Sequence, residues 1–168
     1  TLYRATLRMP GYCRMWNAFV ELGMTDPDYV MEDSEGMSYR DFTFSFINEL
    51  KGKTDEESLA DFLRLDVNDV VIQKLVAVGL LSQDKYEKPN ASPADILEQI
   101  LKEKWVFEEG DVDMVVMQHQ LDYTLEGKSY RMTASMVDKG VDNEHTAISR
   151  TVGLPAAMCA RMILSGDI

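Results

Sequence analysis

From residue 12 onward the spacing of the hydrophobic residues changes twice, and these changes limit the folds open to this chain. Between residues 12 and 101 apolar side chains recur every three to four positions, the spacing of helices that bury one face. Between 113 and 137 they alternate with polar residues, the period of a strand. From 146 to 164 the helical spacing returns. We therefore expect an α+β protein with helices on both sides of a strand region.

Local signals predict where several helices begin. Thr54 with Glu57 three residues later forms the pattern of a capping box. Ser92 is an N-cap residue type, and Pro93 follows it at the first helical position, where a missing N–H costs nothing. A first helix is expected from Tyr12, and four short helices fit the region between it and the strands. In the last helical stretch Pro155 has no N–H to donate, which predicts a kink or a break.

The two ends of the chain are expected to form one sheet. Leu2–Arg8 alternates apolar and polar residues like a half-buried strand. The second alternating region divides at Glu126-Gly127, a suitable turn for an antiparallel hairpin. The expected architecture is a mixed or antiparallel sheet made from the strand near 2–8 and the hairpin near 113–137, with packed helices and a helical inserted lobe.

Charge and composition argue against several classes of function. The chain has 17 Lys and Arg against 29 Asp and Glu, a net charge of −12, which is the wrong sign for binding nucleic acid or an anionic membrane. We see no continuous apolar run of the length that spans a bilayer and no export signal, so a cytoplasmic protein without a membrane partner is expected. Cys13 and Cys159 are too few for a disulfide framework and are expected to be reduced.

Few residues could carry chemistry, and each has a simpler structural interpretation. Cys13 could pair with His119 or His145 as a nucleophile and its base, but a structural cysteine and structural histidines are favoured. Scattered singly, these residues do not have metal-ligand spacing, so no metal site is expected. No two of the 10 glycines form a phosphate-binding loop, so no dinucleotide is expected on this chain.

The end of the first predicted strand is a candidate binding site. Arg8 comes just before the Pro10-Gly11 break that begins a helix, a position where α/β proteins gather ligands. The planar guanidinium of an arginine suits a carboxylate, and Thr6 points a hydroxyl to the same side. From the residues alone, a solvated arginine is the favoured alternative.

Three blocks of the sequence resemble one known family. They are R-A-T-L-R-M-P-G-Y at 4–12, D-M-V-V-M-Q-H at 113–119 and I-S-R-T-V-G-L-P-A-A-M at 148–158. In the same order they are similar to R-G-T-L-R-Y-x-G-aromatic, D-M-(V/I)-V-M-(R/Q)-(H/D) and M-A-K-T-V-G-L-P-x-A-M of the L-glutamate-forming saccharopine dehydrogenases. Met9 departs from the pattern, because the family usually has an aromatic residue there.

This resemblance implies a domain organisation. Family members have an NAD(P)-binding Rossmann domain, an α/β substrate-binding and dimerisation domain, and a helical insert in the latter. By this analogy residues 1–33 and 111–168 belong to the substrate-binding domain and 34–110 are the helical insert. The Rossmann domain is expected to be absent from this chain, together with the cofactor that it binds. The chain begins at Thr1 inside a strand-like stretch, so we expect a piece of a longer polypeptide.

The resemblance also implies a function in lysine metabolism. The family interconverts saccharopine with L-glutamate and 2-aminoadipate 6-semialdehyde by hydride transfer to NAD(P). Thr6, Leu7 and Arg8 match the triplet that touches saccharopine, and Arg8 would hold a substrate carboxylate. No catalytic residue is expected in this chain, and the isolated chain is expected to be inactive. Expected partners are a saccharopine- or glutamate-type substrate, the rest of the polypeptide and a second copy in a homodimer.

Two alternatives stay open at this point. One is a related imine-reducing enzyme that acts on a polyamine-type substrate resembling carboxyspermidine. The other is a binding module without catalytic activity, for which the acidic charge and the methionine-rich hairpin would be suitable.

Overall fold

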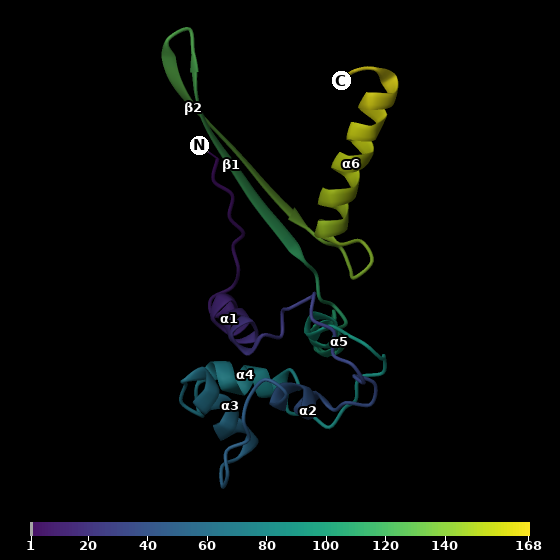
Figure 1. The fold of residues 1–168 in the computed structure, drawn as a ribbon. Helices are drawn as coiled ribbons and strands as arrows, with labels where there is room; N and C mark the ends of the chain where they lie inside the picture. Colours follow the sequence, from purple (N-terminus) through teal and green to yellow (C-terminus); the bar gives the residue numbers. More distant parts are fainter. Residues whose placement is uncertain (1) are drawn as a thin grey trace. The chain divides into compact units, whose positions relative to one another are not determined.

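The computed structural model describes residues 2–168 and divides into two compact units. The first unit extends to Val106 and contains helices α1–α5, and the second, Phe107–Ile168, contains strands β1 and β2 and helix α6 (Figure 1). Helix α1 packs against α3 and α4, so it lies in the same unit as the helices expected to form the insert. The boundaries implied for the domains of the family, 1–33, 34–110 and 111–168, stay a prediction.

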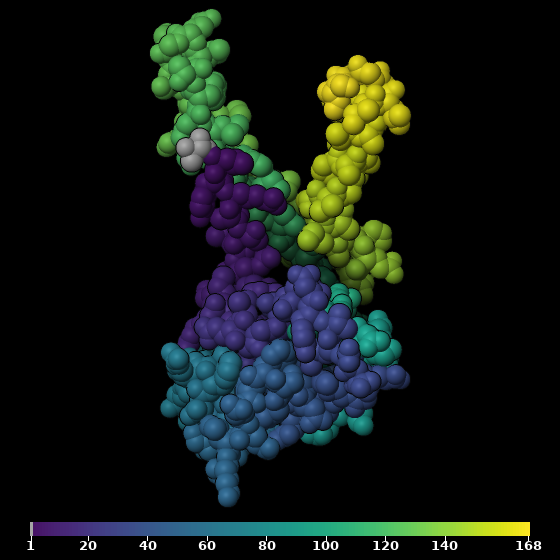
Figure 2. Space-filling model, in the orientation of Figure 1, coloured from purple at the N-terminus to yellow at the C-terminus, as the bar shows by residue number. Residues whose placement is uncertain are grey.

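The first unit is a small helical domain with one hydrophobic core. Its helices form one continuous body in the space-filling view (Figure 2). The four helices expected between the first helix and the strands are present as α2–α5, so that prediction is confirmed. The helices are α1 (Tyr12–Leu22), α2 (Tyr39–Phe44), α3 (Asp55–Leu63), α4 (Val70–Ala77) and α5 (Pro93–Lys104). The fully buried core side chains include Phe19, Phe42, Leu59, Leu75, Ile96 and Ile100.

The predicted helix starts are confirmed by their hydrogen bonds. Thr54 Oγ1 accepts from the Glu57 N–H at 3.2 Å, and the Glu57 carboxylate accepts from the Thr54 N–H at 2.7 Å. Ser92 and Asp95 form the same reciprocal pair, at 3.2 and 2.9 Å. Pro93 is the first residue of α5, as predicted. These bonds satisfy backbone donors that the helices leave free at their first turn.

The strand predicted at 2–8 is wrong. Leu2–Arg8 forms neither helix nor strand, and the side chains of Leu2 and Leu7 are about nine-tenths exposed. A strand is stable only when its backbone N–H and C=O groups pair with a neighbouring strand. An alternating sequence gives one apolar face that could be buried, but it does not supply that partner. Among the residues that the structure describes, the one sheet consists of β1 and β2. The structure is α+β, as predicted, but the predicted sheet made from both ends of the chain does not form.

The predicted hairpin is confirmed, with strands slightly longer than expected. β1 (Met114–Leu125) pairs antiparallel with β2 (Lys128–Lys139) in an unbroken register. Glu126 and Gly127 connect them with φ angles of 50° and 76°. Positive φ at both central residues is the signature of the type I′ turn, whose twist matches that of the strands it joins.

The two faces of this hairpin differ in character. Three pairs of apolar or aromatic residues lie opposite each other on one face, and the Tyr123 and Tyr130 rings stack there with centroids 5.4 Å apart. On the other face Asp122 and Arg131 form an ion pair at 2.6 Å. The apolar face is partly exposed to water along its whole length. Its pairs are Met117 with Met136, Leu121 with Met132, and Tyr123 with Tyr130.

A kink or a break is predicted at Pro155, and helix α6 (Ala147–Ser165) continues through this residue, so the break does not occur. The Thr146 hydroxyl accepts from the Ser149 N–H at 3.1 Å and caps the first turn. By length and composition alone, α6 qualifies as a membrane-spanning helix, although no continuous apolar run suggested one. A single such helix is weak evidence for a membrane, because a core helix of a folded domain meets the same description. The expectation of no membrane partner stays a prediction.

Candidate functional site

The candidate arginine sits directly before a tight turn that leads into α1. Met9, Pro10, Gly11 and Tyr12 form this turn, closed by a 3.1 Å hydrogen bond from the Tyr12 N–H to the Met9 carbonyl oxygen. Gly11 has φ 87° and ψ −17°, the left-handed conformation that glycine adopts without strain at the third position of a type II turn. Proline at the second position favours the same turn. The turn reverses the chain and brings Arg8 back to the start of the helix.

The Arg8 guanidinium lies over the ring of Tyr12. Its central carbon is 5.3 Å from the ring centroid, within the range of a cation–π contact. The other polar contact of the side chain is a 3.5 Å hydrogen bond from Nη1 to the Leu7 carbonyl oxygen. Within residues 2–168 no carboxylate lies at ion-pair distance from Arg8. The exposed guanidinium can therefore accept an anionic ligand without first breaking an ion pair.

The predicted triplet Thr6, Leu7 and Arg8 is exposed, and the structure gives a defined ring contact to Arg8. Leu7 is 90% exposed, so no protein surface in this unit covers it. The binding roles of the three residues stay a prediction. Tyr12, the aromatic residue of the same motif, contacts the Arg8 guanidinium, and the sequence pattern alone did not predict this contact.

Tyr12 is the outer member of an aromatic cluster on α1. Its ring stacks on Trp16, one turn later, with centroids 5.9 Å apart and planes 8° from parallel. Trp105, at the end of α5, lies 6.4 Å from Tyr12 and 6.5 Å from Trp16. Phe19 meets Trp16 edge-on at 5.7 Å and is fully buried. The cluster therefore connects the surface at Arg8 to the core of the helical unit.

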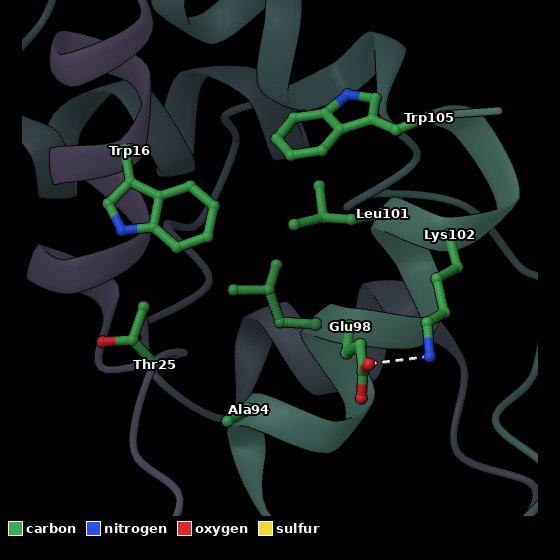
Figure 3. A pocket seen from close by; sticks show the side chains of 8 residues that line it. Trp16, Thr25, Ala94, Glu98, Leu101, Lys102 and Trp105 are labelled. Atoms are coloured by element: carbon green, nitrogen blue, oxygen red, sulfur yellow. Dashed lines mark ion pairs between the residues drawn. The ribbon is translucent and has the colours of Figure 1, made fainter. Parts of the chain in front are cut away.

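A pocket of about 360 Å³ adjoins this cluster between α1 and α5. The indole rings of Trp16 and Trp105 form two of its walls, with Leu101 beside the Trp105 ring (Figure 3). Its polar groups are the Thr25 side chain and an ion pair between Glu98 and Lys102 at 2.7 Å. This lining suits aliphatic or aromatic groups rather than a highly charged ligand. No local pattern predicted the pocket, because Trp16 and Trp105 belong to distant parts of the sequence.

In the described structure each of the two histidine side chains has its polar contact with a residue close to it in the sequence, and the two cysteines are free thiols. His119 Nε2 lies 2.9 Å from the Met117 sulfur, and His145 Nδ1 lies 3.0 Å from an Asp142 carboxylate oxygen. Cys13 and Cys159 are exposed free thiols. Over the described part of the chain, no group of three His, Cys, Asp or Glu side chains is arranged to hold a metal ion. These residues therefore offer no constellation for nucleophilic or metal-assisted chemistry.

The second and third family-like motifs meet in the unit 107–168. The Asp113 carboxylate, just before β1, accepts hydrogen bonds from the Ala147 and Ile148 N–H groups at 2.6 and 2.8 Å. Arg150 in the first turns of α6 pairs with Asp138 of β2 at 2.7 Å. These contacts hold the start of α6 against the base of the hairpin, which gives both motifs a structural role.

Comparison with known proteins gives a consistent result. The family model of the saccharopine dehydrogenase C-terminal domain matches residues 1–168. The chain is 28% identical to saccharopine dehydrogenase [NADP(+), L-glutamate-forming] of Schizosaccharomyces pombe and 25% identical to the Saccharomyces cerevisiae protein of the same name. It is 30% identical to the mitochondrial alpha-aminoadipic semialdehyde synthase of Bos taurus. Each of these alignments covers 100% of this chain.

The chain spans only part of these relatives, 39% of each yeast protein and 19% of the bovine one. The resemblance seen in the three motifs therefore extends over the whole sequence, including the helical region between them that carries no motif. From residue 1 to residue 168, this chain belongs to the saccharopine dehydrogenase C-terminal domain family.

Proposed function

We propose that this chain is the substrate-binding portion of an oxidoreductase that interconverts saccharopine with L-glutamate and 2-aminoadipate 6-semialdehyde, using NAD(P). The observation that carries the proposal is the exposed Arg8 guanidinium, which has no carboxylate partner within residues 2–168 and lies in the T-L-R motif of a chain of this family. Saccharopine and glutamate are carboxylates, and the guanidinium fork matches a carboxylate with two parallel hydrogen bonds.

The residues of this chain do not fit the NAD(P) cofactor. Dinucleotide sites place the pyrophosphate on a free helix N-terminus after a glycine-rich turn. The one described connection from a strand to a helix is the loop from β2 to α6, and it contains a single glycine, Gly140. The Asp113 carboxylate already occupies the N-terminus of α6. We therefore assign no residue of this chain to the cofactor and propose that another part of the polypeptide binds it.

The exposed apolar surface of the second unit supports contacts with the rest of the polypeptide. The hairpin leaves Met117, Leu121 and Met132 between 41% and 49% exposed, and α6 leaves Val152 and Met158 at least 60% exposed. A two-stranded hairpin with an uncovered apolar face is marginal in water. We propose that segments of the longer protein cover these surfaces, so the isolated chain is expected to lack activity.

The test is to replace Arg8 in the full-length protein and measure steady-state kinetics with saccharopine. Arg8→Ala is expected to lower kcat/KM for saccharopine about 30-fold or more, the effect of losing about 2 kcal/mol from a desolvated charge pair. The KM for NAD(P) should not change, because Arg8 does not contact the cofactor in this proposal. Lys51→Ala, which removes a positive charge from an exposed turn of the first unit, is the control and should behave like the wild type.

Two outcomes would overturn the proposal. Unchanged kinetics in Arg8→Ala would show that Arg8 does not bind the substrate carboxylate. Turnover of a carboxyspermidine-type substrate in place of saccharopine would keep the imine-reducing class and change the substrate.

A further inference from the structure

We infer that Tyr12 is a positioning residue for Arg8: its ring holds the guanidinium in the place where the substrate carboxylate is bound. This inference rests on the proposed function, because it assigns Tyr12 a task only if Arg8 binds substrate. Tyr12 acts through Arg8 and makes no contact with the substrate itself. The geometry carries the inference in three steps.

The first step is the direction of the Arg8 side chain. A surface arginine samples many rotamers, and binding a ligand costs it that freedom. Here the Met9–Tyr12 turn places the ring of Tyr12 beside the guanidinium, with 5.3 Å between the Arg8 Cζ atom and the ring centroid. The attraction between a cation and an aromatic face then favours the rotamer that lies over the ring. The guanidinium N–H groups that do not face the ring stay available to a carboxylate, because the side chain has one other hydrogen bond, from Nη1 to the Leu7 carbonyl oxygen.

The second step is the fixed position of the ring. Tyr12 is half-buried, whereas Arg8 is exposed. Trp16 stacks on the ring at 5.9 Å, and Trp105 contacts it from the end of α5 at 6.4 Å. Because these two indoles come from different helices, the ring is held by the tertiary structure of the unit. A ring held in this way can orient Arg8, whereas a freely rotating one could not.

The third step is the chemistry of the contact. No side-chain hydrogen bond is formed by the Tyr12 hydroxyl in the described structure, so the ring face supplies the interaction. A phenylalanine should therefore replace Tyr12, and an aliphatic residue should not. This distinction separates a positioning role through the ring from a role of the hydroxyl in proton transfer or in hydrogen bonding to the substrate.

The experiment uses the full-length enzyme with saccharopine and NAD(P). Tyr12→Leu is expected to raise the KM for saccharopine about two- to fivefold, the size of a cation–π contact at a partly exposed site, with kcat and the KM for NAD(P) unchanged. Tyr12→Phe should retain wild-type kinetics. Tyr12→Met repeats the test with an unbranched side chain, and far-UV circular dichroism confirms the fold of each variant. Tyr29→Leu, at an exposed loop position, is the matched control.

A double-mutant comparison separates positioning from a general structural effect. In the Arg8→Ala background, Tyr12→Leu should cause no further rise in the KM for saccharopine, because there is no guanidinium left to hold. A rise in both backgrounds would overturn the inference, since Tyr12 would then act independently of Arg8. Wild-type kinetics in Tyr12→Leu and Tyr12→Met, with a defect in Arg8→Ala, would overturn the inference and leave the proposed function standing. Wild-type kinetics in Arg8→Ala would overturn both.

Discussion

A single buried hydroxyl, that of Tyr39, connects α2 with α5. It donates a hydrogen bond to the Glu103 carboxylate at 2.6 Å and accepts one from the Gln99 side-chain amide at 3.0 Å. Burial first, and then the hydrogen bond to Glu103, together raise the pKa of Tyr39 from 10.0 to about 12, although the hydrogen bond from Gln99 acts in the opposite direction. A phenolate at this position would be removed from its hydrating water and would lie beside the negatively charged Glu103 carboxylate, so the neutral tyrosine is favoured.

This pKa shift predicts a loss of stability at alkaline pH. In the unfolded chain Tyr39 releases its proton near pH 10, but in the folded chain it keeps the proton until about pH 12. Stability is therefore fully present below pH 10 and falls as the pH rises toward 12, by about 1 kcal/mol per pH unit. Urea unfolding of the 1–168 chain at pH 9 and pH 11 measures this loss. Tyr39→Phe should lack this part of the pH dependence and Tyr29→Phe should retain it; equal dependence in both would contradict the prediction.

Among the elements, the helix starts at Thr54 and Ser92 and the hairpin turn are predicted correctly from neighbouring residues, whereas the break at Pro155 does not occur. The predicted capping pair Thr54–Glu57 joins residues three positions apart, the predicted cap at Ser92 is adjacent to Pro93, and the hairpin turn lies within two residues, so these structures depend on local interactions. The strand at 2–8 required a partner from elsewhere in the chain, and alternation of residues carries no information about one. The candidate site likewise has one part that local sequence predicts and another part that it does not. The motif indicated Arg8, but the pocket and the contacts of Trp105 depend on tertiary packing.

The start of α6 depends on a long-range contact of this kind. The Asp113 carboxylate accepts from the first N–H groups of the helix, where a negative charge is also favoured by the helix dipole. Gly140 lies so close that a Cβ atom there would be 2.2 Å from an Asp113 carboxylate oxygen. The contact therefore requires both an acidic residue at 113 and a glycine at 140.

Removing this contact should fray the helix from its first turn. In the full-length protein, Asp113→Ala is expected to cost α6 about 1 kcal/mol, the usual effect of losing a cap, and to reduce the hydrogen-exchange protection of the Arg150 and Thr151 amides about fivefold. Gly140→Ala should produce the same loss by displacing the carboxylate. Asp122→Asn, at the far end of the hairpin, is the control and should leave α6 unchanged. Unaltered protection in Asp113→Ala would show that the carboxylate does not stabilise the helix.

At the scale of the whole molecule, the two units differ in whether they contain a core. The first buries side chains from all five of its helices around Phe19 and Phe42. In the second, the buried residues of the described structure are Gly140 and Ala147, both beside the loop at the base of the hairpin. Hydrophobic burial is the main favourable term in folding, so the first unit should be stable by itself and the second should not.

This difference predicts the behaviour of the separated units. A fragment of residues 1–106 is expected to unfold cooperatively in urea, at the same midpoint as the 1–168 chain. A fragment of residues 107–168 should show no cooperative transition, because an isolated hairpin and one helix bury too little apolar surface to offset their loss of chain entropy. Circular dichroism of the three chains measures both expectations. A cooperative transition in 107–168 would contradict this account and would weaken the proposal that other segments of the longer protein cover its apolar face. If the transition is absent, the proposal predicts that adding those segments produces one, because they would supply the part of the core that residues 107–168 lack.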